Sequence, residues 1–222
     1  MTIALGVLVS GSGSNLQAIM DRVGDGSLDA EIRIVIANKP DALGLERARQ
    51  AGVPTACVLH ADFPAREDFD RELVRLLRAA KVEVVALAGF MRILTPAFLT
   101  PFAGRVVNIH PALLPACPGL SAQKQQTLHG VRLAGCTVHF VDEEMDHGPI
   151  IIQAAVPAYA DDDEATLGAR ILEMEHRIYP QALQWIAQDR VRVAGRQVVV
   201  RGASRTMGAL WANPPLERPF DS

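Results

Sequence analysis

The 222-residue sequence has little excess charge of either sign, few cysteines and no long uncharged hydrophobic segment. Its 22 Lys and Arg against 25 Asp and Glu give a formal net charge of −3. This balance argues against binding to nucleic acid or to an anionic membrane surface, because both need a concentrated basic field. No segment reaches the roughly 18 to 20 apolar residues of a membrane span. The three cysteines form no CxxC pair, so we expect neither a disulfide framework nor a zinc knuckle, and we expect a cytoplasmic protein.

The first half of the chain alternates apolar runs with helical patterns. Strands are expected at residues 3–9, 31–37, 55–59, 82–88 and 105–109, and helices at residues 16–23, 43–51 and 66–80. Strands that are separated by helices indicate parallel pairing, and continuous apolar strands indicate burial on both faces. The sequence therefore predicts an α/β protein with a Rossmann-like, doubly wound, mostly parallel sheet and helices on both faces.

The second half has a different organisation. A long connection at residues 111–134 holds three prolines and a polar helical stretch, and strands are expected at 137–141 and 149–156. A long helix follows at 163–187, and residues 190–192 and 197–200 suggest a hairpin. With no repeat or linker apparent, we expect one domain over residues 1–193 and a hairpin and tail, residues 194–222, packed on it.

The sequence SGSGSN, residues 10–15, is the first candidate site, because it joins the first strand to the first helix. Gly11 and Gly13 allow a close backbone approach to a ligand, and a helix N-terminus offers N–H groups to an anion. A dinucleotide site would need a third glycine at Leu16 and an acid after the second strand, where Asn38 and Lys39 stand instead. The loop therefore favours a single phosphate over NAD; a purely structural turn is the alternative.

Two further candidates lie later in the chain. Asn108 and His110 are two residues apart at the carboxyl end of a predicted strand, so their side chains leave on one face, where open α/β sheets bind ligands. An amide beside an imidazole can stabilise the oxyanion of acyl transfer, although a histidine that only caps the strand is the alternative. In the acidic turn of residues 142–149, Asp146 is best placed to point inward. His110, His139, Asp146 and His147 lack metal-site spacing, so no metal is expected.

These motifs, in this order, resemble the phosphoribosylglycinamide formyltransferase family of folate-dependent enzymes. The similarity runs from about residue 3 to residue 193 and includes SGSGSN, ANKPDALGLERARQAG, LAGFMRIL, NIHPALLPACPG, TVHFVDEEMDHGPIIIQ and EHRIYP. It implies the formyltransferase fold and transfer of the formyl group of 10-formyltetrahydrofolate to the amine of glycinamide ribonucleotide in de novo purine biosynthesis. The attack would be direct, with no metal and no covalent intermediate. We expect small-molecule partners only and a monomer or weak homodimer.

The resemblance also implies roles for individual residues. Asn108, His110 and Asp146 match the catalytic trio: the His110 imidazolium and the Asn108 amide would stabilise the oxyanion, while Asp146 would orient His110 and favour its charged form. Thr137 would lie beside them. Three further groups would bind substrates: Gly13, Ser14 and Asn15 the phosphate; Glu175 the rest of the nucleotide; and Phe90, Met91, Arg92, Ile93 and Leu94, with backbone from Val141 to Asp146, the folate.

The chain departs from the family in one region. Ser121, Ala122 and Gln123 replace a His-Thr-His-like segment, and Ala134 replaces a usual histidine. We expect both changes on a flexible loop over the active site, residues 121–134. Two rival functions remain. Formyltetrahydrofolate deformylase carries a regulatory domain before its core, which we expect to be absent because the first core strand starts at residue 3. A non-catalytic nucleotide- or folate-binding paralogue is disfavoured by the intact trio.

Overall fold

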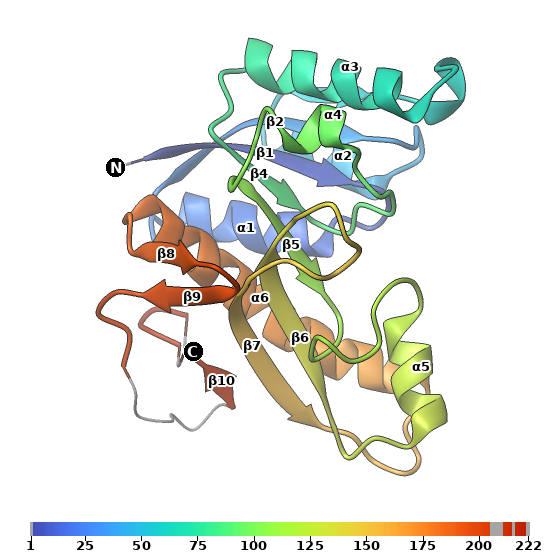
Figure 1. Cartoon of the computed structure of the whole chain (residues 1–222), viewed down its shortest axis with the longest axis vertical. Helices are drawn as coiled ribbons and strands as arrows, with labels where there is room; N and C mark the ends of the chain where they lie inside the picture. Colours follow the sequence, from blue (N-terminus) through green and yellow to red (C-terminus); the bar gives the residue numbers. More distant parts are fainter. Residues whose placement is uncertain (1, 205–210, 215, 221–222) are drawn as a thin grey trace. The chain divides into compact units, whose positions relative to one another are not determined.

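A computed structural model of the chain describes residues 2–204, 211–214 and 216–220 (Figure 1). It divides into two compact units, residues 1–108 and residues 109–222. The single domain expected over residues 1–193, with a tail packed on it, stays a prediction. Within the part that the structure describes, no helix is long and apolar enough to cross a membrane.

The first unit is built on a parallel sheet. Its strands lie in the order β5-β4-β1-β2-β3, and each neighbouring pair is parallel. The bounds are β1 Ile3–Val9, β2 Ala30–Ala37, β3 Thr55–Cys57, β4 Val84–Leu87 and β5 Val106–His110. All four residues of β4 and six of the seven in β1 are buried, as expected for strands that are covered on both faces.

Helices cover both faces of this sheet, as predicted. They are α1 Ser14–Gly24, α2 Leu43–Gln50, α3 Arg66–Ala79 and the short α4 Pro96–Leu99, with a 3-10 turn at His60–Asp62. A Cβ added at Gly6 of β1 would lie 2.5 Å from Cδ2 of Leu77 in α3, whereas a Cβ added at Gly44 of α2 would lie 3.0 Å from Cγ2 of Val9. Gly6 and Val9 point to opposite faces because side chains alternate along a strand. Helices α3 and α2 therefore pack on opposite faces, and Figure 1 shows α1 and α3 on opposite sides of the strands.

The second unit combines an antiparallel sheet with one long helix. β6 Leu133–Phe140 pairs antiparallel with β7 Ile150–Pro157, and the short β10 Ala212–Asn213 pairs antiparallel with β7. Helix α6, Glu164–Ala187, packs against β6 and β7 through buried residues at helical spacing, which include Leu167, Ile171, Met174, Ile178 and Leu183. A capping box between Asp163 and Thr166 starts the helix. The remaining elements are α5 Ala122–His129 and the hairpin of β8 Val191–Ala194 and β9 Gln197–Val200.

The region expected to be a flexible loop, residues 121–134, is largely regular. Residues 122–129 form α5, and β6 begins at Leu133, because its pairing with β7 extends to Leu133 opposite Pro157. Ala134 is fully buried in this strand, opposite Val156. The expectation that Ala134 lies on an active-site loop is therefore wrong.

Candidate active site

The glycine loop after β1 is shaped by contacts with α2. Gly13 has a φ of +68°, and a Cβ there would lie 2.5 Å from the Cα of Gly44. The Gly44 N–H donates to the Gly11 carbonyl at 3.1 Å, and Arg47 Nε donates to the Ser12 carbonyl at 2.9 Å. Gly13 is therefore required for both its backbone conformation and its lack of a side chain. Ser14 and the buried Asn15 begin α1, whose first N–H groups are the kind that bind anions.

The loop after β1 is hydrogen-bonded to the segment that follows β4. The Ser10 hydroxyl donates to Asn38 Oδ1 at 2.6 Å and accepts from the Met91 N–H at 2.9 Å, and the Ser10 N–H donates to the Gly89 carbonyl at 3.1 Å. The strand order reverses between β1 and β4, which makes this the topological switch point where ligands bind in open α/β sheets. In the sequence, Asn38 stands only as a residue that disfavours NAD. Its position directly after a parallel strand is the signal that could have identified it as the hydrogen-bond partner of Ser10 in this loop.

The segment from Phe90 to Leu94 lies at the same edge of the sheet and presents two apolar side chains to solvent. Phe90 and Leu94 are buried, whereas Met91 is 62% exposed and Ile93 is 52% exposed. Met91 and Ile93 are two residues apart, so the two exposed apolar side chains are close in sequence. The two side chains therefore offer a surface for part of a flat, partly apolar ligand.

Helix α3 holds this segment in place. Arg66 donates to the Ile93 carbonyl at 2.8 Å, and Asp70 accepts from the Thr95 N–H at 2.7 Å. The Arg92 guanidinium lies 4.9 Å from the centre of the Phe69 ring. Burial raises the pKa of Asp70, while its hydrogen bonds to Thr95 oppose that rise. These contacts hold the segment at Arg92, Ile93 and Thr95.

His110 ends β5 with both ring nitrogens next to oxygen atoms. It is buried, and Nε2 lies 2.8 Å from the Cys117 carbonyl oxygen, while Nδ1 lies 3.3 Å from Oδ2 of Asp146. A carbonyl and a carboxylate oxygen both accept, so the arrangement suits an imidazolium, which donates from both nitrogens. Asn108, half-buried and two residues earlier on β5, projects from the same face of the strand.

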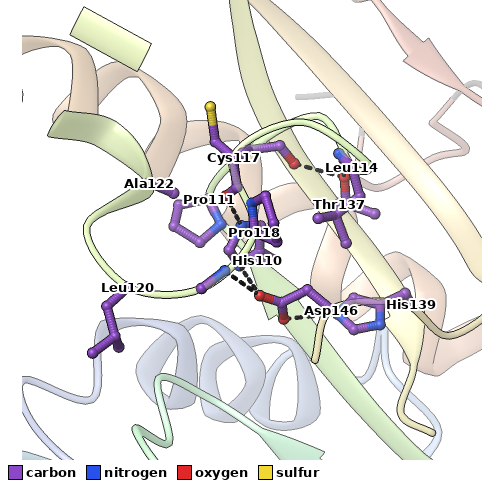
Figure 2. Close-up of polar contacts among 12 residues, drawn as sticks. His110, Pro111, Leu114, Cys117, Pro118, Leu120, Ala122, Thr137, His139 and Asp146 are labelled. Atoms are coloured by element: carbon purple, nitrogen blue, oxygen red, sulfur yellow. Dashed lines mark hydrogen bonds and ion pairs between the residues drawn. The ribbon is translucent and has the colours of Figure 1, made fainter. Parts of the chain in front are cut away.

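The Asp146 carboxylate lies between two imidazole rings (Figure 2). Oδ2 faces His110 and also accepts from the Gly119 N–H at 2.7 Å, whereas Oδ1 lies 3.8 Å from Nε2 of His139. The carboxylate is only 12% exposed. Of the acids in the turn at residues 142–149, Asp146 is the one that points into this cluster, while Glu143 and Glu144 are exposed. The structure thus brings His110 and Asp146 together within the second unit.

His139 is a member of this cluster that sequence analysis considered only as a metal ligand. It is buried, and its Nδ1 lies 2.8 Å from the Phe140 carbonyl oxygen, to which it donates. Burial lowers the pKa of His139, although the hydrogen bond to Phe140 and the charge of Asp146 act in the opposite direction. Burial therefore favours the neutral form of the ring. Its position two residues after Thr137 on the same strand is the sequence feature that could have identified it.

Thr137 supports the backbone that follows His110. Its hydroxyl donates to the Ala112 carbonyl at 2.7 Å and accepts from the Leu114 N–H at 3.0 Å and from Gln153 Nε2 at 2.9 Å. Thr137 is fully buried. This hydroxyl holds residues 112–114 in place, and Gln126 of α5 similarly donates to the Pro111 carbonyl at 2.8 Å.

Glu175 is a buried acid on α6. Burial, and secondarily the charge of Glu175, raises the pKa of the Cys136 thiol on β6 well above its usual value. Among the described residues, no group of three or more His, Cys, Asp or Glu side chains is arranged to hold a metal ion.

The sequence profile of the formyl transferase family matches residues 3–183. The chain is 48% identical over 187 residues to phosphoribosylglycinamide formyltransferase from Escherichia coli, covering 84% of this chain and 88% of that enzyme. It is also 53% identical over 179 residues to the trifunctional purine biosynthetic protein adenosine-3 of Drosophila melanogaster, covering 80% of this chain. That match takes up only 13% of the much longer trifunctional protein.

Solved structures give the same result at the level of the fold. The crystal structure of glycinamide ribonucleotide transformylase 1 from Symbiobacterium toebii matches with a TM-score of 0.89 and 50% identity, covering 90% of this chain and 94% of that one. Phosphoribosylglycinamide formyltransferase from Anaplasma phagocytophilum matches with a TM-score of 0.85 and 40% identity, covering 92% and 97%. The predicted α/β class with a mostly parallel sheet is confirmed.

Proposed function

The chain belongs to the formyl transferase family, and we propose that it transfers the formyl group of 10-formyltetrahydrofolate to the amine of glycinamide ribonucleotide with Asn108, His110 and Asp146 as its catalytic residues. Its activity is that of a phosphoribosylglycinamide formyltransferase of de novo purine biosynthesis. The observation that supports the catalytic assignment best is the contact between the buried His110, at the carboxyl end of β5, and the half-buried Asp146, 3.3 Å away.

The proposed reaction is a direct acyl transfer. The amine attacks the formyl carbon and forms a tetrahedral intermediate; the bond to the folate N10 then breaks, N10 gains a proton and the amine nitrogen loses one. The Nε2–H of His110, which here donates to the Cys117 carbonyl, would exchange that partner for the developing oxyanion, with the Asn108 amide as a second donor. Asp146 keeps the imidazolium oriented and offsets its charge.

We also propose which residues bind the two substrates. The phosphate of the nucleotide would lie at Gly13, Ser14 and Asn15, on the N-terminus of α1. The exposed apolar pair Met91 and Ile93 would take the flat face of the folate. The similarity to the family also assigns folate binding to Phe90, Arg92 and Leu94 and to the backbone from Val141 to Asp146, and it assigns the rest of the nucleotide to Glu175.

A steady-state assay with both substrates tests this proposal. Formyl-folate should disappear only when glycinamide ribonucleotide is present, with one formylated product for each folate released. Consumption of formyl-folate without the amine would indicate a deformylase, which passes the group to water. Binding of both substrates without turnover would indicate a non-catalytic paralogue. Either result would overturn the proposal.

A further inference from the structure

Arg196, at the turn of the β8–β9 hairpin, contacts the loop that carries Asp146. Its Nη2 donates to the His147 carbonyl at 2.6 Å, and its Nη1 lies 2.7 Å from Nε2 of the His147 ring. The Nδ1 of the same ring lies 3.1 Å from Oδ2 of Asp142. The same Nη1 also lies 3.0 Å from Nδ1 of the ring, so Arg196 contacts the His147 side chain as well as its carbonyl. The transfer reaction as proposed above makes no use of Arg196.

The backbone that Arg196 contacts has a constrained conformation. Asp146, the residue before His147, has a φ of +52°, in the left-handed region that favours glycine. On the other side, a Cβ at Gly148 would lie 1.8 Å from the Phe140 carbonyl oxygen. A strained conformation persists only where surrounding contacts impose it. Two of these contacts are the Gly119 N–H on the carboxylate and Arg196 on the next carbonyl.

We infer that Arg196 is a positioning residue for the transfer reaction: by fixing the His147 carbonyl, it holds the Asp146 carboxylate against His110. This inference rests on the proposed catalytic role of Asp146. The distance from Asp146 to His110 is already 3.3 Å, so a small rotation of the loop would separate the charges. Displacements of about 1 Å at a catalytic group can cost on the order of 10²-fold in rate. Since Arg196 is exposed and Gly119 holds the carboxylate as well, we expect a smaller loss.

The hairpin also supplies a matched control. Arg192 lies on the same hairpin and makes a bidentate contact with Asp189, at 2.8 and 2.7 Å, away from the Asp146 loop. Arg192→Met removes an arginine and a surface ion pair from the same element. A general loss of hairpin stability would affect both variants alike, whereas positioning of Asp146 would affect only Arg196.

The experiment measures kcat and both KM values for Arg196→Met, Arg196→Lys and Arg192→Met, alone and with Asp146→Asn. We expect Arg196→Met to lower kcat about 5- to 10-fold, with both KM values within about 2-fold, because the effect is on the transition state. Arg196→Lys should retain most of kcat, since an ammonium still donates to the carbonyl. Arg192→Met should match the parent. In the Asp146→Asn background, Arg196→Met should have less than about a 2-fold further effect, because residues that act through one another are not additive.

Several results would overturn the inference. These are a normal kcat for Arg196→Met, an equal loss in Arg192→Met, a loss confined to the folate KM, or a full additional loss in the Asp146→Asn background. Thermal melts identify a variant that does not fold, in which case Arg196→Gln takes its place in the same cycle. A normal rate for Asp146→Asn alone would instead refute the catalytic trio, so the two failures are distinguishable.

Discussion

Replacing Asp146 with Asn tests the catalytic cluster most directly. The change keeps the size of the side chain and an oxygen that can accept from the Gly119 N–H, but it removes the negative charge 3.3 Å from His110 Nδ1. Two unit charges at this distance attract by about 5 kcal/mol at an effective dielectric constant of about 20. The asparagine dipole recovers part of this attraction, and only the part that grows in the transition state affects the rate. If the substitution removes half of this attraction from the transition state, kcat falls by about 10²-fold.

The assay follows formyl-folate loss under saturating conditions, together with calorimetry for each ligand. Affinity for both ligands should change little, because the interaction acts mainly on the transition state. Glu144→Gln is the matched control: it makes the same chemical change in the same loop, where the carboxylate is 75% exposed and 3.9 Å from His147. We expect that control to stay within about 2-fold of the parent, since exposed pairs contribute little. A turnover of Asp146→Asn within about 3-fold of the parent would refute the reasoning.

Two further predictions concern the glycine loop and the cysteines. Gly13→Ala should lower the free energy of unfolding by more than the roughly 1–2 kcal/mol that its left-handed backbone costs, because its Cβ would also meet Gly44. Gly11→Ala has open space, so it should cost less than about 0.5 kcal/mol of stability while weakening nucleotide binding. Urea unfolding measures the stabilities and calorimetry the binding, and equal stabilities of the two variants would contradict the prediction. A thiol reagent should modify exposed Cys57 in the native protein but Cys136 only after denaturation, because burial excludes the reagent and raises the pKa of that thiol; rapid native labelling of Cys136 would contradict the structure.

The sequence predicts the central strands of the first unit, β1 and β4, because they are buried on both faces. The apolar runs in β1 and β4 are continuous, so each strand is visible without knowledge of its neighbours. The short elements are harder to predict. Helix α4 has four residues and depends on the Thr95 hydroxyl, which caps the Ala97 N–H, and on Asp70, which holds the Thr95 N–H. Such elements are fixed by tertiary contacts that no local pattern contains.

The start of β6 shows a second limit of sequence analysis. Leu133 and Ala134 follow a polar helical stretch, so local pattern places them in a loop. Their strand conformation is imposed by antiparallel pairing with β7, where Leu133 lies opposite Pro157. β10 is similar, because two residues form a strand only through their pairing with β7. Pairing between distant segments is not encoded in any short window of sequence.

The candidate site divides in the same way. Strand spacing puts Asn108 and His110 on one face, and a tight turn favours an inward Asp146. The groups that hold them could not be predicted: the Cys117 carbonyl and the Gly119 N–H are backbone atoms, and Arg196 acts on the backbone carbonyl of His147. A backbone atom has no signature in the amino-acid sequence, so its role becomes visible only once the chain is folded.

His139 makes the stability of the fold depend on pH. Because burial lowers its pKa in the folded state, the unfolded chain, where a histidine has a pKa of about 6.5, takes up this proton first as the pH falls. Stability is therefore complete above about pH 6.5 and decreases toward the lower folded pKa, by at most about 1.4 kcal/mol for each pH unit. Asp146 and Asp142 oppose the lowering of the His139 pKa, and His110 adds to it.

His139→Gln keeps an amide donor for the Phe140 carbonyl but cannot titrate, so its unfolding free energy should fall less than that of the parent between pH 7 and pH 5.5. Urea unfolding of both proteins at pH 8, where the histidine is unprotonated in the folded and the unfolded state alike, gives the packing cost of the substitution alone. Parallel decreases below pH 6.5 would show that His139 takes up its proton in the folded state as readily as in the unfolded one.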